Sequence, residues 1–535
     1  MMKYEKWMMR FVWAVGVLAL AALIFLLVGL FVLPDSPTGP VRYESETEST
    51  VAELPEKESG KGQPDSETGE SEPDGSMQME RETDPGREEN PEREKADVTA
   101  GKQPDRETEK PQSEKPPVLF LATDLHYQAP EMTDFGTALD AYTKGNDGNI
   151  VPYLEAITDA FLEEVTAARP SALILSGDIS QNGERKNHEE LALRLSRVKE
   201  AGIPVLVLPG NHDINHPWSA SYYNDRTERV PGVNAQEFYE IYRDFGYDQA
   251  ISRDGASLSY VYQLDDRYRI MMLDSCIYEP VHKTGGRIRS ETLQWMEEQL
   301  EAAKAAGATV IPVAHHNLLG ESKLYPEDCT LENGAQVTEL LERYRVPVFL
   351  SGHLHLQRIK KHTAGPMSEG EYGIYEIVTS PLTMSPCQYS VLEWQEDGSL
   401  SYHAQKLDME GWARRYGEED ENLLHFTEYA DEFLVKTVAD QVFLGMDDIR
   451  EEKKWEMAEL YGRLNRDYCS GTYIDVRAVK RSEPYLHWKR YQKSSLWAAR
   501  LNCILQDAGR SHTELTIPAE EFKDRNQEEM IQDGI

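Results

Sequence analysis

The hydrophobic pattern changes at residue 118, where short apolar runs begin to alternate with amphipathic segments. The run VLFLA at 118–122, and later the runs within SALILSGD and GIPVLVLPGNHD, have the length and composition of buried strands. Between these runs, 152–169 and 184–200 repeat apolar residues at intervals of three and four, which predicts helices. Strand and helix therefore alternate, which indicates a layered α/β domain.

The alternation continues to about residue 406. We expect strands in 257–264, 267–275, 308–317, 346–355, 372–380, 388–394 and 399–405, and helices over 291–306 and 333–344. From 407 to 535 the pattern turns helical and forms a separate C-terminal region. No internal repeat is visible.

Two polar stretches, 127–149 and 214–257, are too long for ordinary connections between elements. The second is rich in aromatic side chains, including Tyr222, Tyr223, Phe238, Tyr239 and Tyr242. Two interpretations stay open for these side chains. They form a cap over a substrate, or they only pack the small core of the insertion itself.

An uncharged apolar run covers residues 11–33. At about 1.5 Å per residue, a helix of this length crosses a hydrocarbon core about 30 Å thick. Lys3, Lys6 and Arg10 precede the run, so the positive-inside rule places 1–10 in the cytoplasm and everything after residue 33 outside the cell membrane. The alternative is a cleaved signal peptide, but no small-x-small cleavage site follows the run.

Charge excludes one class of partner. The 535 residues include 94 acidic and 56 basic side chains, for a formal net charge of −38, so no nucleic-acid-binding surface is expected. Much of the acidity lies in 34–117, where few apolar residues occur and an ordered core cannot form, so we expect a disordered spacer. The five cysteines match neither a disulfide framework nor a CxxC metal pattern.

Polar clusters follow five of the expected strands, each where the strand ends. They are Asp124 with His126, Asp178, Asn211 with His212, His315 with His316, and His353 with His355. Ligands of open α/β sheets bind in the crevice outside the carboxyl ends of the strands, so we expect these groups to meet there. Carboxylate, imidazole and amide donors without thiolate suit Mn, Fe or Zn.

Taken singly, each cluster has an ordinary explanation as a turn, because Gly and Asp favour turns and Asp caps helices. Imidazole is not a favoured turn residue, however, and the clusters recur at strand ends. A joint metal site explains all five clusters together. Asp274 also ends an expected strand, and we expect it to hydrogen-bond a loop and not to bind metal.

The motifs DLH, GDISQNG, GNHD, AHHN and GHLH occur in an order that resembles the calcineurin-like metallophosphoesterase superfamily. The resemblance covers about 118–405. It implies a four-layer α/β/β/α sandwich, here with a helical C-terminal extension and an N-terminal transmembrane helix. It also implies two divalent or trivalent metal ions joined by one carboxylate and a metal-bridging hydroxide that attacks phosphorus.

By the same resemblance, each metal has four protein ligands. The first would be held by Asp124, His126, Asp178 and His355. The second would be held by Asp178, Asn211, His315 and His353. Asp178 would bridge the two ions and count with His212 as catalytic. His212 and Asn211 would contact substrate.

The AHHN motif leaves an alternative open. His315 fits the family pattern best, but His316 competes for the ligand position or contacts substrate, and Asn317 stands where many members have proline. The expected activity is hydrolysis of a phosphate mono- or diester, including nucleotides or cyclic nucleotides. The alternatives are a phospholipid or protein phosphatase on the same fold, or a non-catalytic surface binding module.

The expected organisation follows from these observations. It comprises a cytoplasmic tail (1–10), a transmembrane anchor or uncleaved signal (11–33), an acidic spacer (34–117), a metallophosphoesterase domain (118–406) and a helical C-terminal region (407–535). The partners are a phosphate ester and the membrane. The sequence does not specify an oligomeric state.

Overall fold

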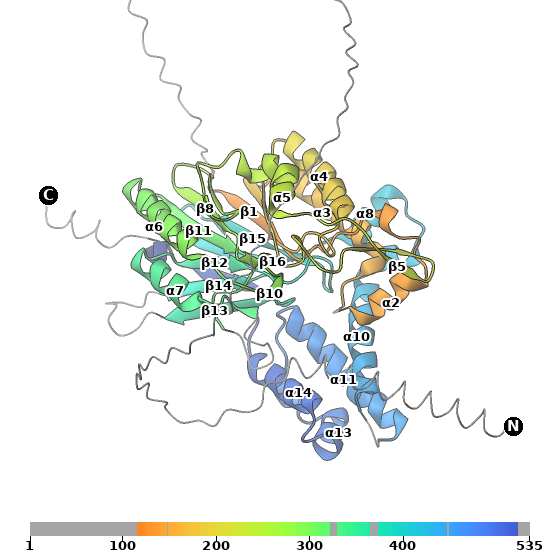
Figure 1. The fold of residues 1–535 in the computed structure, drawn as a ribbon. Coiled ribbons are helices and arrows are strands. Elements are labelled where there is room, and N and C mark those ends of the chain that lie inside the picture. The colour runs from red at the N-terminus through yellow and green to blue at the C-terminus, as the bar shows by residue number, and fades with distance from the viewer. Residues whose placement is uncertain (1–114, 147, 321–328, 364–372, 447–448, 523–535) are drawn as a thin grey trace, which may run out of the picture. The chain divides into compact units, whose positions relative to one another are not determined.

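The computed structural model describes residues 115–522, apart from 147, 321–328, 364–372 and 447–448 (Figure 1). The expected membrane anchor and all of the expected spacer before residue 115 lie outside the described residues. Within the described part, no helix combines the length and the apolar character needed to cross a bilayer. The described residues belong to one unit, Pro111–Ile535.

Two mixed sheets form the centre of this unit. The first has the strand order β17-β16-β15-β1-β2-β3. Its strands are β1 (Val118–Ala122), β2 (Ala172–Ser176), β3 (Val205–Leu208), β15 (Gln388–Trp394), β16 (Leu400–Lys406) and β17 (Glu514–Ile517). The continuous apolar runs of β1, β2 and β3 are explained by their position, because these parallel strands are almost entirely buried.

The second sheet has the order β13-β14-β12-β11-β8-β7-β6. Its strands are β6 (Ser252–Arg253), β7 (Tyr260–Gln263), β8 (Tyr268–Leu273), β11 (Thr309–Ala314), β12 (Val348–Ser351), β13 (Arg358–Thr363) and β14 (Gly373–Val378). β8, β11, β12 and β14 are parallel. The carboxyl ends of β11 and β12 therefore lie at one edge of this sheet.

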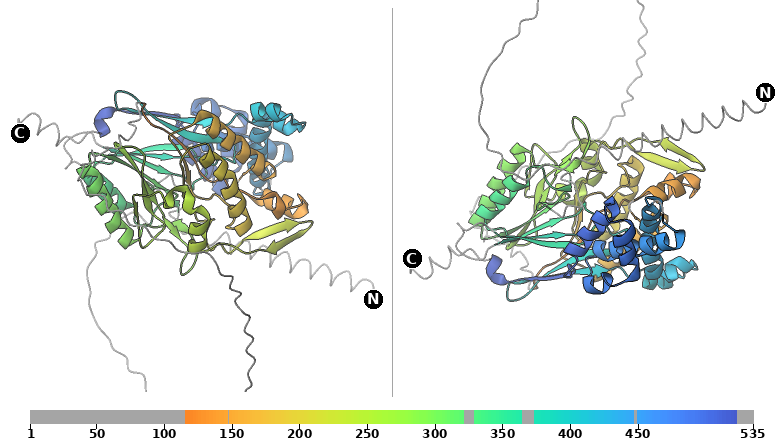
Figure 2. Two further views of the ribbon diagram at one scale, coloured as in Figure 1. Left: turned by 90° about the horizontal axis from the view of Figure 1, so that it is seen from above. Right: turned by 90° about the horizontal axis from the view of Figure 1, so that it is seen from below.

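Helices cover the outer faces of both sheets, which gives the expected α/β/β/α layers (Figures 1 and 2). On the first sheet lie α3 (Leu154–Ala168) and α4 (Arg185–Glu200), and on the second lie α6 (Ser290–Ala305) and α7 (Gly334–Arg343). Ile157 and Leu191 belong to the main core with the strands, whereas Met296 and Leu341 belong to a second cluster beneath α6 and α7. Burial of these apolar stripes holds the layers together.

The C-terminal region is mainly helical, as predicted, but it also contains a strand that the helical prediction missed. Its helices are α8 (Met409–Tyr416), α9 (Glu421–Leu424), α10 (Phe426–Leu444), α11 (Glu451–Cys469), α12 (Val476–Val479), α13 (Glu483–Tyr491) and α14 (Leu496–Asp507), with a 3₁₀ turn at Ala519–Phe522. After α14 the chain returns to the first sheet as β17, which pairs antiparallel with β16. Four residues of alternating exposure give too weak a periodic signal to be recognised.

The two insertions fold into small elements of their own. They contain α2 (Thr137–Gly145), the hairpin of β4 (Ala220–Tyr223) and β5 (Arg226–Arg229), α5 (Ala235–Tyr242), a π-helical turn (Arg243–Tyr247) and 3₁₀ turns at Pro130–Met132 and Val151–Tyr153. Two short strands, β9 (Cys276–Ile277) and β10 (Lys283–Gly286), pair antiparallel between β8 and α6 in the sequence.

The aromatic side chains of the second insertion serve packing. Tyr222 joins Leu139 of the first insertion in a small separate core, while Phe238 and Tyr242 are fully buried in the main core. Tyr239 packs against the main core, and the Tyr223 hydroxyl donates to the Glu131 carbonyl. The packing interpretation of these residues is therefore the one that the structure supports.

Candidate metal centre

The polar clusters meet at the carboxyl ends of the parallel strands, as their positions predict. They follow β1, β2 and β3 of the first sheet and β11 and β12 of the second. The backbone is unusual there, because positive φ angles occur at Asp124 (52°), His126 (43°), Asp178 (49°), His353 (69°) and His355 (53°). Left-handed conformations cost energy in residues other than glycine and concentrate at functional sites.

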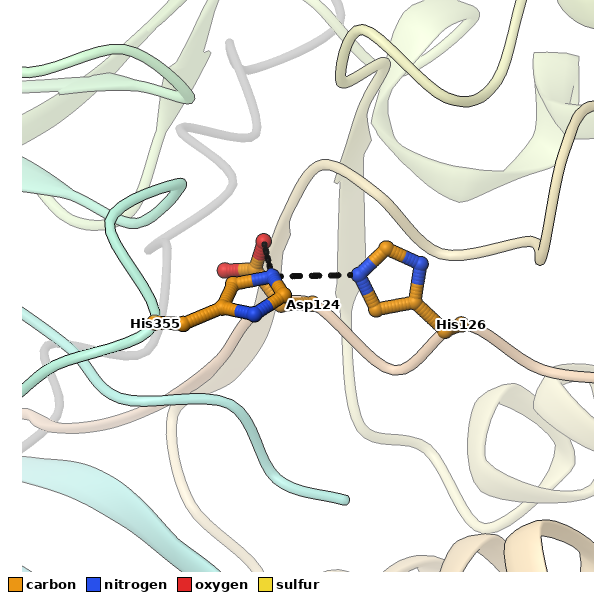
Figure 3. A group of neighbouring side chains, drawn as sticks. All are labelled: Asp124, His126 and His355. Carbon is orange, nitrogen blue, oxygen red and sulfur yellow. Dashed lines mark hydrogen bonds and ion pairs between the residues drawn. The ribbon is translucent and has the colours of Figure 1, made fainter. Parts of the chain in front are cut away.

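Asp124, His126 and His355 form the first group of converging side chains (Figure 3). Nε2 of His126 lies 3.3 Å from Nε2 of His355, which in turn lies 3.4 Å from Oδ1 of Asp124. That oxygen is buried and makes no hydrogen bond of good geometry to any described residue. A buried carboxylate oxygen beside two facing imidazole nitrogens is a donor set that a cation would satisfy.

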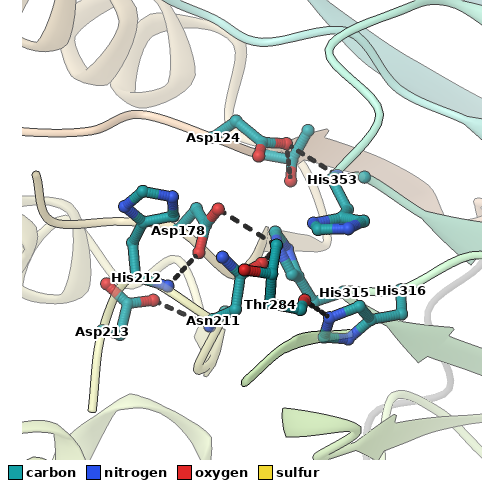
Figure 4. Close-up of polar contacts among 12 residues, drawn as sticks. Asp124, Asp178, Asn211, His212, Asp213, Thr284, His315, His316 and His353 are labelled. Carbon is teal, nitrogen blue, oxygen red and sulfur yellow. Dashed lines mark hydrogen bonds and ion pairs between the residues drawn. The ribbon is translucent and has the colours of Figure 1, made fainter. Parts of the chain in front are cut away.

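Asp178, His315 and His353 form the second group (Figure 4). Nδ1 of His315 donates to the Ser176 carbonyl at 2.9 Å, so Nε2 faces the site. This Nε2 lies 3.2 Å from Oδ2 of Asp178 and 3.2 Å from Oδ1 of Asn211. A backbone acceptor on the far side of the ring is how metal-binding histidines are commonly oriented.

The two groups are joined through the loop that carries Asp124. Its Oδ2 accepts a hydrogen bond from the backbone N–H of His353 at 3.0 Å and another from the Thr123 hydroxyl at 2.7 Å. A ligand residue of one group therefore holds the backbone of a ligand residue of the other. Gly352 is required for this approach, because a Cβ there would lie 2.1 Å from Oγ1 of Thr123.

Histidine and leucine alternate in SGHLHLQ, so that successive side chains face either the candidate metal site or a hydrophobic cluster. His353 and His355 enter the two groups, whereas Leu354 and Leu356 are buried in a hydrophobic cluster with residues of the C-terminal helices. The backbone N–H of Gln357 then donates to the carbonyl of Cys469 at the end of α11. The C-terminal region thus packs behind the loop that carries two of the candidate ligands.

His212 lies beside the two groups and belongs to neither. Its backbone N–H donates to Oδ1 of Asp178 at 2.7 Å. Its Nδ1 donates to the Gln181 carbonyl at 3.0 Å and to Oδ1 of Asn182 at 2.9 Å. Nε2 is therefore the ring atom left to face a substrate.

Both ring nitrogens of His316, the alternative ligand or substrate contact, are hydrogen-bonded within the protein. Its Nδ1 lies 2.8 Å from the Ser275 hydroxyl, and its Nε2 donates to the Thr284 carbonyl at 2.9 Å. The ring packs against that of His353, with centroids 4.5 Å apart, but it is not part of either converging group. Of the two neighbouring histidines, His315 is the one that enters a converging group in the described residues.

Electrostatics put the candidate ligands in the protonation states that a cation needs. Burial alone would raise the pKa of Asp124, but His355 and His315 lower it below its ordinary value, and His315 and His212 likewise lower the pKa of the buried Asp178. Burial lowers the pKa of His126 to about 3 and that of His353 well below its ordinary value. Anionic carboxylates and neutral imidazoles are the forms that bind metal ions.

His315 is the exception among the candidate ligands. Burial opposes its charged form, but the carboxylate of Asp178 prevails and raises the pKa of His315 to about 9. The buried pair behaves as an imidazolium beside a carboxylate until a cation replaces the proton.

Sequence reasoning missed a residue that holds the loops together. Asp213 of GNHD accepts from the backbone N–H groups of Ile179, Ser180 and Gly210. It thereby ties the loop after β2, which carries Asp178, to the loop after β3. The strand-end position of Asp213 was a usable signal, whereas the loop contacts of Asp274 were anticipated: it accepts from the N–H groups of Leu258 and Cys276.

Comparison with known proteins gives the same class as the geometry. Residues 118–357 match the family model described as calcineurin-like phosphoesterase, and 408–511 match the C-terminal domain of cyclic nucleotide phosphodiesterase. Residues 118–357 therefore form a calcineurin-like phosphoesterase domain, and membership in this family supports a hydrolase of phosphoesters. The two matches are separated by residues 358–407.

Among curated relatives, a probable cyclic nucleotide phosphodiesterase of Synechococcus sp. is 27% identical over 35% of this chain and 58% of its own length. A probable glycerophosphodiester phosphodiesterase of Arcobacter nitrofigilis is 25% identical over 44% of this chain and 77% of its own length. Among solved structures, a dimetal phosphatase of Danio rerio is 13% identical with a TM-score of 0.39, and the match covers 55% of this chain and 96% of that one.

Proposed function

We propose that this protein hydrolyses phosphodiesters at a dinuclear metal centre, with nucleotides or cyclic nucleotides as the substrate class. The observation that carries the proposal is the pair of converging ligand groups, with His212 bonded through its backbone to Asp178 of the second group. The names of the relatives and the C-terminal family match support a diester over a monoester. The Arcobacter relative favours glycerophosphodiesters as a second candidate substrate class.

The proposed ligand set follows the two groups. Asp124, His126 and His355 hold one ion, and His315, His353 and Asn211 hold the other. Asp178, which lies in the second group and contacts the loop of His212, is proposed to bridge the ions. Nitrogen and oxygen donors without thiolate suit Mn, Fe or Zn.

Two cations held here would activate a water molecule between them and neutralise charge on the phosphoryl oxygens. The chain's own residues orient the reaction. Asn182 and Gln181 fix the ring of His212 so that Nε2 can donate to a phosphoryl oxygen or pass a proton to the departing alcohol. Asp213 fixes the two loops that must stay aligned for in-line displacement.

Location is a separate part of the proposal. The apolar run 11–33 and the basic side chains Lys3, Lys6 and Arg10 support a single membrane anchor with the phosphoesterase domain outside the cell membrane. The acidic segment 34–117 would then act as an extended spacer. The substrate would be an extracytoplasmic phosphodiester.

The test uses the full chain, purified and loaded with Mn²⁺. Bis(p-nitrophenyl) phosphate should be hydrolysed faster than p-nitrophenyl phosphate, and elemental analysis should give two ions per chain. His353→Ala and His355→Ala should each lower the metal content toward half, because each removes one of about four ligands of a single ion. Asp178→Ala is the control that should lose both ions. A protein that holds two ions but turns over neither ester would instead be a binding module.

A further inference from the structure

A row of imidazole rings extends outward from the metal centre. The His126 ring meets the His212 ring edge-on, with centroids 5.0 Å apart. The His212 ring stacks on that of His216 at 4.8 Å, and the His216 ring meets that of His282 at 4.9 Å. His282 and His216 belong to neither converging ligand group in the described residues, so the row does not form a third metal site of that kind.

The row ends at a cavity. His282 donates from Nε2 to the backbone carbonyl of Asn211 at 2.6 Å, so this wall of the cavity contacts a loop that carries a candidate ligand. The cavity has a volume of about 810 Å³. Its lining residues are mostly polar: Asn215, Tyr278, Glu279, Pro280, His282 and Arg289.

The groups around the cavity are suited to a polar organic substituent. The Arg289 guanidinium lies 5.3 Å from the centre of the Tyr278 ring, which supplies a positive charge beside an aromatic face. Nδ1 of His216 accepts from the backbone N–H of Trp218, so its Nε2 carries the proton of the neutral ring. Burial is the main cause that lowers the pKa of His216 to about 3, which keeps this ring neutral.

We propose that Arg289 and His282 of the cavity lining, together with His216, whose ring contacts those of His282 and the catalytic His212, form the subsite for the nucleoside part of the substrate. The inference rests on the proposed phosphodiesterase function and assigns residues that determine its specificity. A donor imidazole, a guanidinium and an aromatic ring together recognise hydroxyl and base groups. A long acyl chain would find few apolar partners in this cavity.

The experiment compares two substrates on the Mn²⁺-loaded full chain. Methyl p-nitrophenyl phosphate is the minimal diester, and adenosine 3′,5′-cyclic monophosphate carries the nucleoside. Arg289→Met keeps the aliphatic stem beside Tyr278 but removes the charge, and His216→Phe keeps a ring against His212 but removes the donor. Each should lower the ratio of kcat/KM for the nucleotide to that for the minimal diester by about tenfold or more.

Arg287→Met is the matched control. Arg287 is exposed, lies two residues from Arg289, pairs only loosely with Glu332 at 3.9 Å and does not line the cavity. Its substitution should leave the ratio within twofold. His282 is not the first choice for substitution, because its bond to Asn211 also supports the ligand loop.

Inhibition provides a second measurement. If Arg289 had only a structural role, its substitution would not selectively weaken inhibition by a nucleotide. Adenosine monophosphate should inhibit the wild-type protein more tightly than inorganic phosphate, and Arg289→Met should remove most of that advantage. The subsite is wrong if both substrates lose activity in parallel, if neither variant changes the ratio, or if adenosine monophosphate inhibits no better than phosphate. A wild-type protein inactive even on the minimal diester would instead contradict the proposed function.

Discussion

His212 lies beside the candidate ligands, and hydrogen bonds hold both its ring and its backbone. Two acceptors hold its Nδ1, and its backbone N–H binds Asp178. His212→Ala should lower kcat by about 10²–10⁴, the usual contribution of a positioned acid or transition-state donor. The metal content, measured by mass spectrometry, should stay at the wild-type value, since the backbone bond remains. Loss of an ion would move His212 into the ligand set.

His188 gives a prediction about acid stability. It is fully buried, and its ring lies near Ser180 and Tyr242, away from the ligand groups. Burial lowers its pKa from 6.5 to about 4, so between these values the unfolded chain binds a proton that the folded chain does not. The protonation of His188 therefore leaves the free energy of unfolding unchanged above pH 6.5 and lowers it as the pH falls toward 4.

The measurement is denaturant unfolding at pH 7.0 and pH 5.5. Between these two pH values, the free energy of unfolding of the wild-type protein should fall by about 1 kcal/mol more than that of His188→Gln, because glutamine does not titrate. The other buried histidines are present in both proteins and cancel in the comparison. An equal loss in both proteins would show that His188 is not the group responsible.

At the scale of elements, the loop after β12 depends on the helices behind it. Leu356 is fully buried in the cluster that contains the C-terminal helices, while its neighbour His355 belongs to the first ligand group. Leu356→Ala should destabilise the protein by about 2–5 kcal/mol and also reduce the metal affinity of that group, because the loop loses its anchor.

Leu300→Ala is the matched control, since Leu300 is equally apolar and only 2% exposed, but belongs to α6 and to another cluster. It should cost a similar free energy of unfolding. Its metal content after dialysis against a weak chelator should stay at the wild-type value. Equal metal loss in both variants would mean that general destabilisation, and not the anchor, controls binding.

The elements also show what the sequence could and could not predict. β1, β2 and β3 were predictable because burial on both faces leaves a continuous apolar run. β13 was not, because RIKKHT is an edge strand whose exposed side chains remove the hydrophobic signal. The motifs indicated side chains that converge in two groups in the structure, whereas His282 carries no motif and contacts Asn211 across 71 residues of chain.

For the whole molecule, the topology can be tested on intact cells. The proposed anchor at 11–33 and spacer at 34–117 predict that external protease cuts within the spacer and releases an active fragment. Activity on bis(p-nitrophenyl) phosphate in the supernatant, with the fragment detected by an antibody to the C-terminal region, is the measurement. Protection of the domain until the cells are lysed would reverse the assigned orientation.

Because Leu354 and Leu356 pack against the helical region, bound metal should also affect the stability of that region. If the helices favour the loop geometry that binds metal, then by thermodynamic reciprocity bound metal must favour the docked helices by the same free energy. Bound metal ions would then stabilise the docked position of α10 and α11, although these helices provide none of the candidate ligands. Hydrogen exchange in these two helices should therefore slow when Mn²⁺ is added.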